Sequence, residues 1–315
     1  MIEGILIEGL VYGIMALGVF IAFRVLDFAD LTVEGSFPFG AAAGGALLAG
    51  GAAAPAALLA AFAAGALAGC ATSAIHHGFK VPPLLAGIVT MTGLYSVDLR
   101  LLGGRANLPL ITFNPVMRGS EAWLGPGVPP VLASAAAFGL GALALVLALD
   151  LFFHTELGIA IGALGDNETS VVSVGADPTA LRSIGIALAN GLAGLSGALA
   201  ASYQGFADVN FGSGVIAAGL ASVMLGELLL PSSRIGVQLL RVLAGSVLFR
   251  AIMYAGRSWG YLAGITPNDL RLLNALLVVA ALAASRGRAR LSRDAALRRA
   301  KRGRGSPARG GGGAS

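Results

Sequence analysis

The stretch "FADLTVEGSFPFG" at residues 28–40 is a polar island between two long apolar runs, and a related stretch, "FADVNFGSGVIAAG", recurs at 206–219. In both copies Phe-Ala-Asp precedes a segment rich in Gly and Ser. Gly35 and Pro38 disfavour a continuous helix, since proline has no N–H to donate and restricts the residue before it. Irregular backbone at membrane depth is tolerated only where protein buries it or where it lines a wet cavity. We therefore expect a helix broken near a membrane face at 28–40.

The rest of the chain is strongly apolar, with 56% apolar and 12% charged residues and a mean hydropathy of +0.82 over 315 residues. Soluble domains carry about 25% charged residues, so this composition argues against a soluble domain with a buried core. At about 20 residues per span, the chain predicts an all-α, polytopic membrane helix bundle of about nine transmembrane helices over residues 1–285. The expected spans are 4–23, 31–50, 54–74, 84–102, 129–152, 181–203, 212–230, 237–256 and 268–285.

Small residues recur four positions apart in several of these spans, as in Gly9/Gly13, Gly40/Gly44 and Gly65/Gly69. Such pairs let helix backbones approach closely, and van der Waals packing drives helix association in lipid. The single cysteine, Cys70, lies in an apolar run, where a small packing residue is the usual role. A lone cysteine also excludes a disulfide framework within the chain.

Ten of the 21 Lys and Arg residues follow Ala284, and the remaining chain holds 11 basic against 15 acidic side chains. A basic tail beside a last apolar segment is typical of the cytoplasmic side and of contact with anionic lipid. The alternative, nucleic acid, lacks the aromatic residues that stack on bases. We expect 286–315 to be a basic, Gly-rich, disordered cytoplasmic tail. Counting spans back from it places 153–180 inside and the N-terminus outside.

The two Phe-Ala-Asp copies indicate an inverted repeat with broken helices. On this topology the first copy follows a span that runs inward and the second follows one that runs outward. The first four spans would then repeat, upside down, as the sixth to ninth. Transporters often have this design, with the substrate site at the repeat interface. The matching stretch covers about a dozen residues, so chance similarity stays an alternative.

The polar residues of the two islands are candidates for a translocation path, because carboxylates at membrane depth are costly and usually functional. The alternative is an ordinary interfacial loop whose acids sit in water. For Glu227 and Arg250, which fall within later spans, structural pairing and a transport role both stay open, and Asp98 is expected to reach water at a helix end. The candidate path residues are Asp30, Thr32, Glu34, Ser36, Phe206, Asp208, Asn210 and Ser213.

A second informative stretch is "GIAIGALGDNETSVVSVGAD", 158–177, within the predicted cytoplasmic loop 153–180. Asp166 or Asn167 could cap a short helix by bonding its free N–H groups. Asp177 could cap the next helix, with Pro178 at its first position. Connectors longer than about 12–15 residues usually have a function, and a short helix across the inner face suits docking of a partner.

At these residues the chain resembles binding-protein-dependent ABC permeases of the branched-chain amino-acid and ribose type. "GIAIGALGDNETSVVSVGAD" stands where these permeases carry their coupling loop. "LDFADLTVEGSFPFGAAAGG", "LAGIVTMTGLYSVDLRLLGGRANLPL", "YQGFADVNFGSG" and "ITPNDLRLLNALLVVAAL" match a subgroup described as uncharacterised or tryptophan-type permeases. The resemblance extends to about residue 285.

The resemblance implies a multi-pass subunit of the bacterial inner membrane that imports a small organic solute, such as an amino acid. It implies three protein partners, namely ATP-binding-cassette ATPase subunits, an external solute-binding protein and a second permease copy. Many relatives have basic residues where Ile161 and Ala163 stand here, which departs from the family pattern. The residues implied in ATPase coupling are Gly158, Gly165, Asp166, Asn167, Thr169, Gly175 and Asp177.

The chain itself offers no catalytic site for ATP. A P-loop needs G-x-x-x-x-G-K-[ST], and the only lysines, Lys80 and Lys301, lie in other contexts. No paired-histidine metal motif occurs, and no convergent set of acid, base and nucleophile residues is evident, so we expect no cofactor, no metal and no enzymatic activity. The alternative function is an ion-coupled secondary transporter that uses Asp30, Glu34 and Glu227. Such a transporter does not need the 153–180 loop.

Overall fold

The computed structural model describes residues 2–111, 114–125, 127–230, 232–260, 272, 274–281 and 283. The described chain is almost entirely helical, which confirms the predicted all-α membrane bundle. Six helices are long and apolar enough to cross a membrane. They are α1 (Ile2–Phe20, continued by the π-helix η1, Ile21–Val25), α3 (Ala54–Phe79), α4 (Pro83–Leu101), α6 (Pro130–Phe153), α9 (Pro178–Gln204) and α11 (Ile235–Gly260).

Two apolar helices are shorter than the spans expected from the sequence. α2 (Val33–Ala49) has 17 residues and α10 (Val215–Leu229) has 15, against the ~20 that a crossing needs. Each follows a Phe-Ala-Asp copy and an irregular segment. Of the predicted ninth span, 268–285, only residues 272, 274–281 and 283 are described, and they are helical. The predicted tail, 286–315, lies outside the described residues.

The break that the sequence placed at Gly35 and Pro38 lies earlier in the chain, at 26–32, and Pro38 stands inside α2. Proline cannot donate to the carbonyl four residues before it, which is the carbonyl of Glu34. Gly212 packs against that carbonyl so closely that any side chain at 212 would clash with it. The carbonyl that Pro38 leaves without a helical donor therefore lies at a packing contact with the second island.

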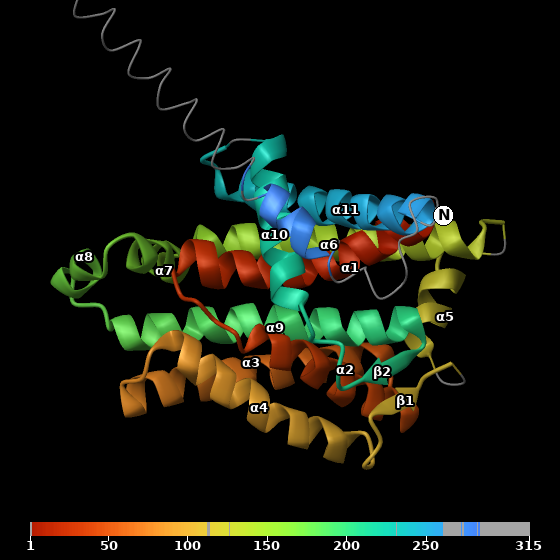
Figure 1. Cartoon of the computed structure of the whole chain (residues 1–315), viewed down its shortest axis with the longest axis horizontal. Coiled ribbons are helices and arrows are strands. Elements are labelled where there is room, and N and C mark those ends of the chain that lie inside the picture. The colour runs from red at the N-terminus through yellow and green to blue at the C-terminus, as the bar shows by residue number, and fades with distance from the viewer. Residues whose placement is uncertain are drawn as a thin grey trace, which may run out of the picture.

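α1 and α9 form the enclosed centre of the bundle and run in opposite directions (Figure 1). α1 packs against α10 and α11, and α9 packs against α2 and α3. This exchange of partners is the arrangement that an inverted repeat of α1–α3 and α9–α11 requires. It supports the repeat beyond the dozen matched residues.

The predicted glycine pairs all lie at close helix contacts. Gly40 packs on the backbone of Gly194, Gly65 on that of Asn190, and Gly69 on that of Ile186, so α2 and α3 both meet α9 through glycine. Gly9 and Gly13 face Val247 and Leu243 of α11, and Gly44 faces Ala198 of α9. Close backbone approach through small residues thus holds the centre of the bundle together.

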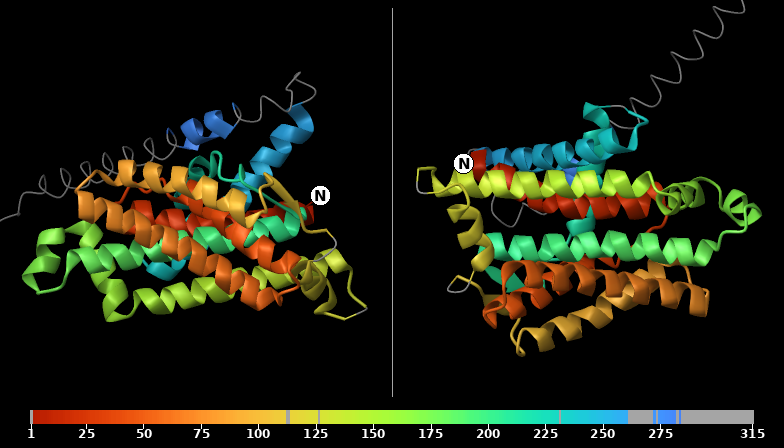
Figure 2. Two further views of the ribbon diagram at one scale, coloured as in Figure 1. Left: turned by 90° about the horizontal axis from the view of Figure 1, so that it is seen from below. Right: turned by 180° about the vertical axis from the view of Figure 1, so that it is seen from behind.

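The two ends of the bundle carry different elements. α7 (Glu156–Asp166), α8 (Glu168–Ser173) and the α3–α4 connection lie at one end, and the N-terminus, α5 (Pro115–Ala122) and the strands lie at the other (Figures 1 and 2). β1 (Asn107–Pro109) pairs antiparallel with β2 (Phe206–Asp208), with Asn107 opposite Asp208. The N-terminus and the 153–180 loop therefore lie at opposite ends of the bundle, as the span count predicted. The second Phe-Ala-Asp copy is therefore a short strand, which the sequence did not predict.

Candidate functional site

The first island is anchored by a buried hydrogen-bond network. Asp30 is fully buried, and its Oδ1 accepts the backbone N–H of Thr32 at 2.8 Å. Asn190 of α9 donates from Nδ2 to Asp30 Oδ2 at 2.6 Å, and its Oδ1 accepts the hydroxyl of Ser36 at 2.7 Å. One amide side chain thus ties both the irregular segment and α2 to α9.

A row of hydroxyl groups extends this network to α3 and α4. The Oγ1 atoms of Thr32 and Thr72 are 2.6 Å apart, and Thr72 donates to Thr90 at 2.9 Å. All three threonines are buried. Together with Asn190, these bonds fix the start of α2 against three neighbouring helices.

The second island repeats the local geometry of the first. Asp208 Oδ1 accepts the backbone N–H of Asn210 at 2.7 Å, as Asp30 accepts that of Thr32. Asn107 donates from Nδ2 to Asp208 Oδ2 at 3.2 Å, as Asn190 does to Asp30, but in an exposed setting. The two Phe-Ala-Asp copies therefore share a turn that begins at the aspartate. In each copy the carboxylate of the aspartate accepts a hydrogen bond from the backbone N–H two residues later.

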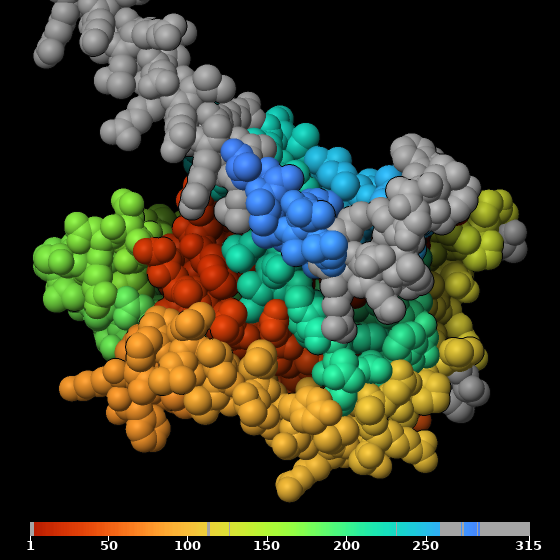
Figure 3. Space-filling model, in the orientation of Figure 1, coloured from red at the N-terminus to blue at the C-terminus, as the bar shows by residue number. Residues whose placement is uncertain are grey.

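The two islands meet at a cavity of about 290 Å³ on one face of the bundle. α2 lines it with Glu34 and Pro38, α4 with Tyr95 and Asp98, and the segment after β2 with several residues that include Asn210. Figure 3 shows α4, in orange, beside the segment after β2 on this face. The cavity therefore lies where the first repeat contacts the second, the usual place of a substrate site in such folds.

Glu34 faces the N-terminal end of α10, where the backbone N–H groups of Gly214 and Ile216 lie close enough to interact with its carboxyl group. The free N–H groups and the dipole at a helix N-terminus stabilise a negative charge. The structure thereby gives Glu34 a partner in the second repeat, while its side chain stays only half-buried on the cavity wall.

The predicted path residues fall into two groups in the structure. Glu34, Asn210 and Ser213 line the cavity. The others hold the islands in place: Asp30, Thr32 and Ser36 in the buried network, Asp208 in its turn, and Phe206 with its ring centroid 5.2 Å from that of Phe211.

Sequence reasoning assigned the wrong environment to Asp98 and did not single out Asn190, Thr72 or Thr90. Asp98 was expected to reach water, yet it is 1% exposed and lines the cavity. A polar residue in an apolar helix was the available signal for the other three. That signal does not say which helix each one faces, so it could not group them around Asp30.

The predicted coupling loop folds as two short helices whose exposed face lies at one end of the bundle. Asn167, one of the two predicted caps, accepts the N–H of Ser170 at 3.3 Å and begins α8. Asp177 accepts the N–H of Thr179 at 2.9 Å and begins α9 with Pro178 in its first turn, as predicted. The cap of α7, Thr155, was not predicted.

The glycines of this loop allow it to pack on the bundle. Gly158 sits on the backbone of Phe152 and Phe153, and Gly165 sits on the carbonyl of Val25 at the end of η1. Gly175 has a φ of +84°, a left-handed conformation that favours glycine. Asp166 and Thr169 are exposed and lie on the outer surface of the loop.

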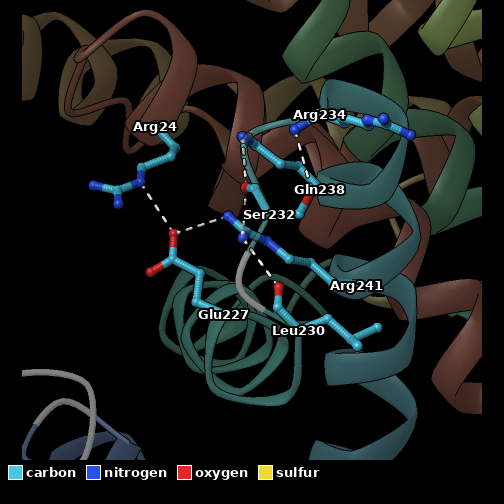
Figure 4. A network of polar contacts seen from close by, with 7 residues as sticks. All are labelled: Arg24, Glu227, Leu230, Ser232, Arg234, Gln238 and Arg241. Carbon is cyan, nitrogen blue, oxygen red and sulfur yellow. Dashed lines mark hydrogen bonds and ion pairs between the residues drawn. The ribbon is translucent and has the colours of Figure 1, made fainter. Parts of the chain in front are cut away.

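The charged residues of the later spans are paired in the structure. Glu227 Oε1 lies 3.0 Å from Arg24 Nε and 3.4 Å from an Nη of Arg241 (Figure 4). Arg241 also donates to the carbonyls of Leu230 and Ser232. Arg250 pairs with Glu8 at 3.5 Å and stacks over the ring of Tyr12. Structural pairing, one of the two roles left open, is therefore present for both Glu227 and Arg250.

Among the residues that the structure describes, no three His, Cys, Asp or Glu side chains come together to hold a metal ion.

Comparison with known proteins agrees with this architecture. The family described as branched-chain amino acid transport system, permease component, matches residues 1–282. A tyrosine transport system permease protein of Clostridioides difficile (strain R20291) is 34% identical over 282 residues, which cover 90% of each chain. An uncharacterized protein of Rickettsia prowazekii (strain Madrid E) is 30% identical over 217 residues, 68% of this chain and 72% of that one. No solved structure gives a significant match.

Proposed function

Because the chain belongs to the branched-chain amino acid transport system permease family of ABC importers, we propose that it imports an amino acid together with separate ATPase subunits, an external binding protein and a second copy of itself. The solute class is supported by the similarity to a permease named for tyrosine transport. The subunit would sit in a bacterial inner membrane with α7, α8 and the C-terminus on the cytoplasmic side. ATP hydrolysis would take place in the partner subunits.

The proposed contact with the ATPase rests on the surface formed by α7 and α8. It projects at one end of the bundle with Asp166, Thr169 and Asp177 exposed. It is also fixed, because Gly165 sits on the end of η1 and Glu168 pairs with Arg182 of α9 at 2.9 Å. A surface both exposed and rigidly joined to the two central helices is suited to transmit motion from a bound subunit.

The translocation path is proposed to run along the repeat interface, past Glu34, Asn210 and Ser213. These residues line the cavity between the two islands. Asp30, Thr32, Ser36, Phe206 and Asp208 would shape this path from behind, by holding the two irregular segments in their turns.

The test is purification of the chain with its candidate ATPase, followed by uptake of labelled amino acids into proteoliposomes. Thr169→Arg should abolish co-purification, because it places a long charged side chain in the contact surface. Glu121→Arg is the matched control, since Glu121 is exposed on α5 at the opposite end. Uptake that continues without ATP but follows an ion gradient would overturn the proposal in favour of a secondary transporter.

A further inference from the structure

The cavity between the two islands contains a carboxyl group for which the described residues provide no counterpart. Asp98 is 1% exposed, and its Oδ1 has no hydrogen-bond partner among the described residues. Its chain neighbour Arg100 points to the exposed side of α4 and forms no ion pair with it. An ionisable group buried without a partner is expensive, and such groups often mark a functional site.

Glu34 adds a second carboxyl group to the same cavity. It differs from Asp98 because the free N–H groups at the N-terminus of α10 lie beside its carboxyl group. None of the described residues that line the cavity is Lys, Arg or His. Among the described residues, the cavity therefore has two acidic groups, one of them unpaired, and no basic group to balance them.

The other walls define the size and character of what could enter. Tyr95 and Thr92 add hydroxyl groups, and Pro38 and Met91 add apolar surface. A volume of about 290 Å³ is at the lower end of the ~300–1,000 Å³ usual for ligand pockets, and so fits one amino acid rather than a peptide.

We propose that Asp98, assisted by Glu34, recognises the positively charged ammonium group of the transported solute. The ammonium group supplies the counter-charge and the hydrogen-bond donors that Asp98 lacks. This inference rests on the proposed function, because it places the transported amino acid in the cavity.

The test measures the charge selectivity of the cavity and does not need ATP or any partner. Cys70 is the only cysteine, so Cys70→Ser gives a background with none. Ser213→Cys in that background places a thiol on the cavity wall. The full-length permease in nanodiscs is treated with 2-(trimethylammonium)ethyl methanethiosulfonate, which is cationic, and with the anionic 2-sulfonatoethyl reagent.

The cationic reagent should react faster at Ser213→Cys. The ratio of the two rates should fall at least about fivefold with Asp98→Asn, because one unit charge about 10 Å away changes local ion concentrations by roughly an order of magnitude at an effective dielectric of ~20. Asp98→Glu should preserve the ratio. Ala53→Cys, exposed between α2 and α3, is the matched control, and its ratio should not respond to Asp98→Asn.

Protection identifies the ligand chemistry. Tyrosine and tyramine, which both carry an ammonium group, should slow the reaction at Ser213→Cys, whereas 3-(4-hydroxyphenyl)propionate, which has none, should not. Equal protection by all three, protection by none, or an unchanged ratio in Asp98→Asn would overturn the inference. These results would leave the importer assignment standing, because loss of ATPase co-purification is a separate measurement.

Discussion

Asn190→Leu should destabilise the protein by about 2–3 kcal/mol, because the isosteric change removes the amide that joins α9 to the first island. Three hydrogen bonds are lost, to Asp30, to Ser36 and to the carbonyl of Ile186. The Ile186 carbonyl keeps its helical partner, and Ser36 can turn to a carbonyl of its own helix. The cost therefore comes mainly from Asp30, which stays buried with its Oδ2 unpaired.

The magnitude follows from two limits. A hydrogen bond to a charged group contributes about 1.5–3 kcal/mol, and leaving a buried acceptor unsatisfied costs at least about 1–3 kcal/mol. Side-chain hydrogen bonds in a membrane protein average ~0.6 kcal/mol and reach ~1.7. The 2.6 Å contact and the complete burial of Asp30 place the cost above that membrane average and within the range for a charged acceptor left unpaired. A loss of ~2.5 kcal/mol corresponds to about a sixtyfold change in the unfolding equilibrium.

The inverted repeat provides the matched control. Asn107 donates to Asp208 through the same atoms, but at 3.2 Å and in an exposed position. Asn107→Leu should therefore cost less than about 1 kcal/mol, since water can replace the lost bond. Reversible unfolding of both variants in bicelles gives the free energy of unfolding. Equal losses, or a loss below 1 kcal/mol for Asn190→Leu, would refute the claim that the buried network holds the first island.

Three other perturbations test separate contacts. Glu227→Gln should lower the melting temperature because Arg241 is left buried without its carboxylate, and Arg241→Gln in the same chain should restore part of the loss; if the two changes simply add, the pair contributes nothing. Asn167→Ala should speed hydrogen exchange within α8, because losing the N-cap costs about 1 kcal/mol of helix stability, and unchanged exchange would show that the cap is not needed. Gly212→Val should prevent a monodisperse folded preparation because its side chain meets the Glu34 carbonyl, and normal folding would show that this approach is not required.

The elements that the sequence predicted well are those whose signal is local. Eight of the nine predicted spans, which were identified from their apolar runs, coincide with described helices. Small residues four apart marked close helix contacts, and the Asn167 and Asp177 caps were correct because a cap bonds an N–H only two or three residues away. In each case, one segment of chain determines the outcome.

The errors arose where a residue's environment comes from another helix. Pro38 was expected to break α2, but Gly212 from the second island packs against the carbonyl that proline leaves free. Asp98 was expected at the water interface because it lies near a helix end, yet neighbouring elements bury it. Nothing in the sequence near either residue states which distant segment will cover it.

A continuous set of contacts joins the exposed end of α7 to the cavity. Gly165 bears on the carbonyl of Val25, at the end of η1, and the irregular segment that contains Asp30 begins one residue later. Asp30 is held by Asn190, so that segment cannot move without disturbing α9, and it leads directly into the first turn of α2, which carries Glu34 to the cavity wall. Because η1 is a π-helix, a geometry that interrupts the regular α-helical bonds, the α1 end of this chain of contacts is the part best able to change shape. We propose that a displacement of α7 would reach Glu34 along these contacts, and that the buried network around Asp30 would limit how far it spreads.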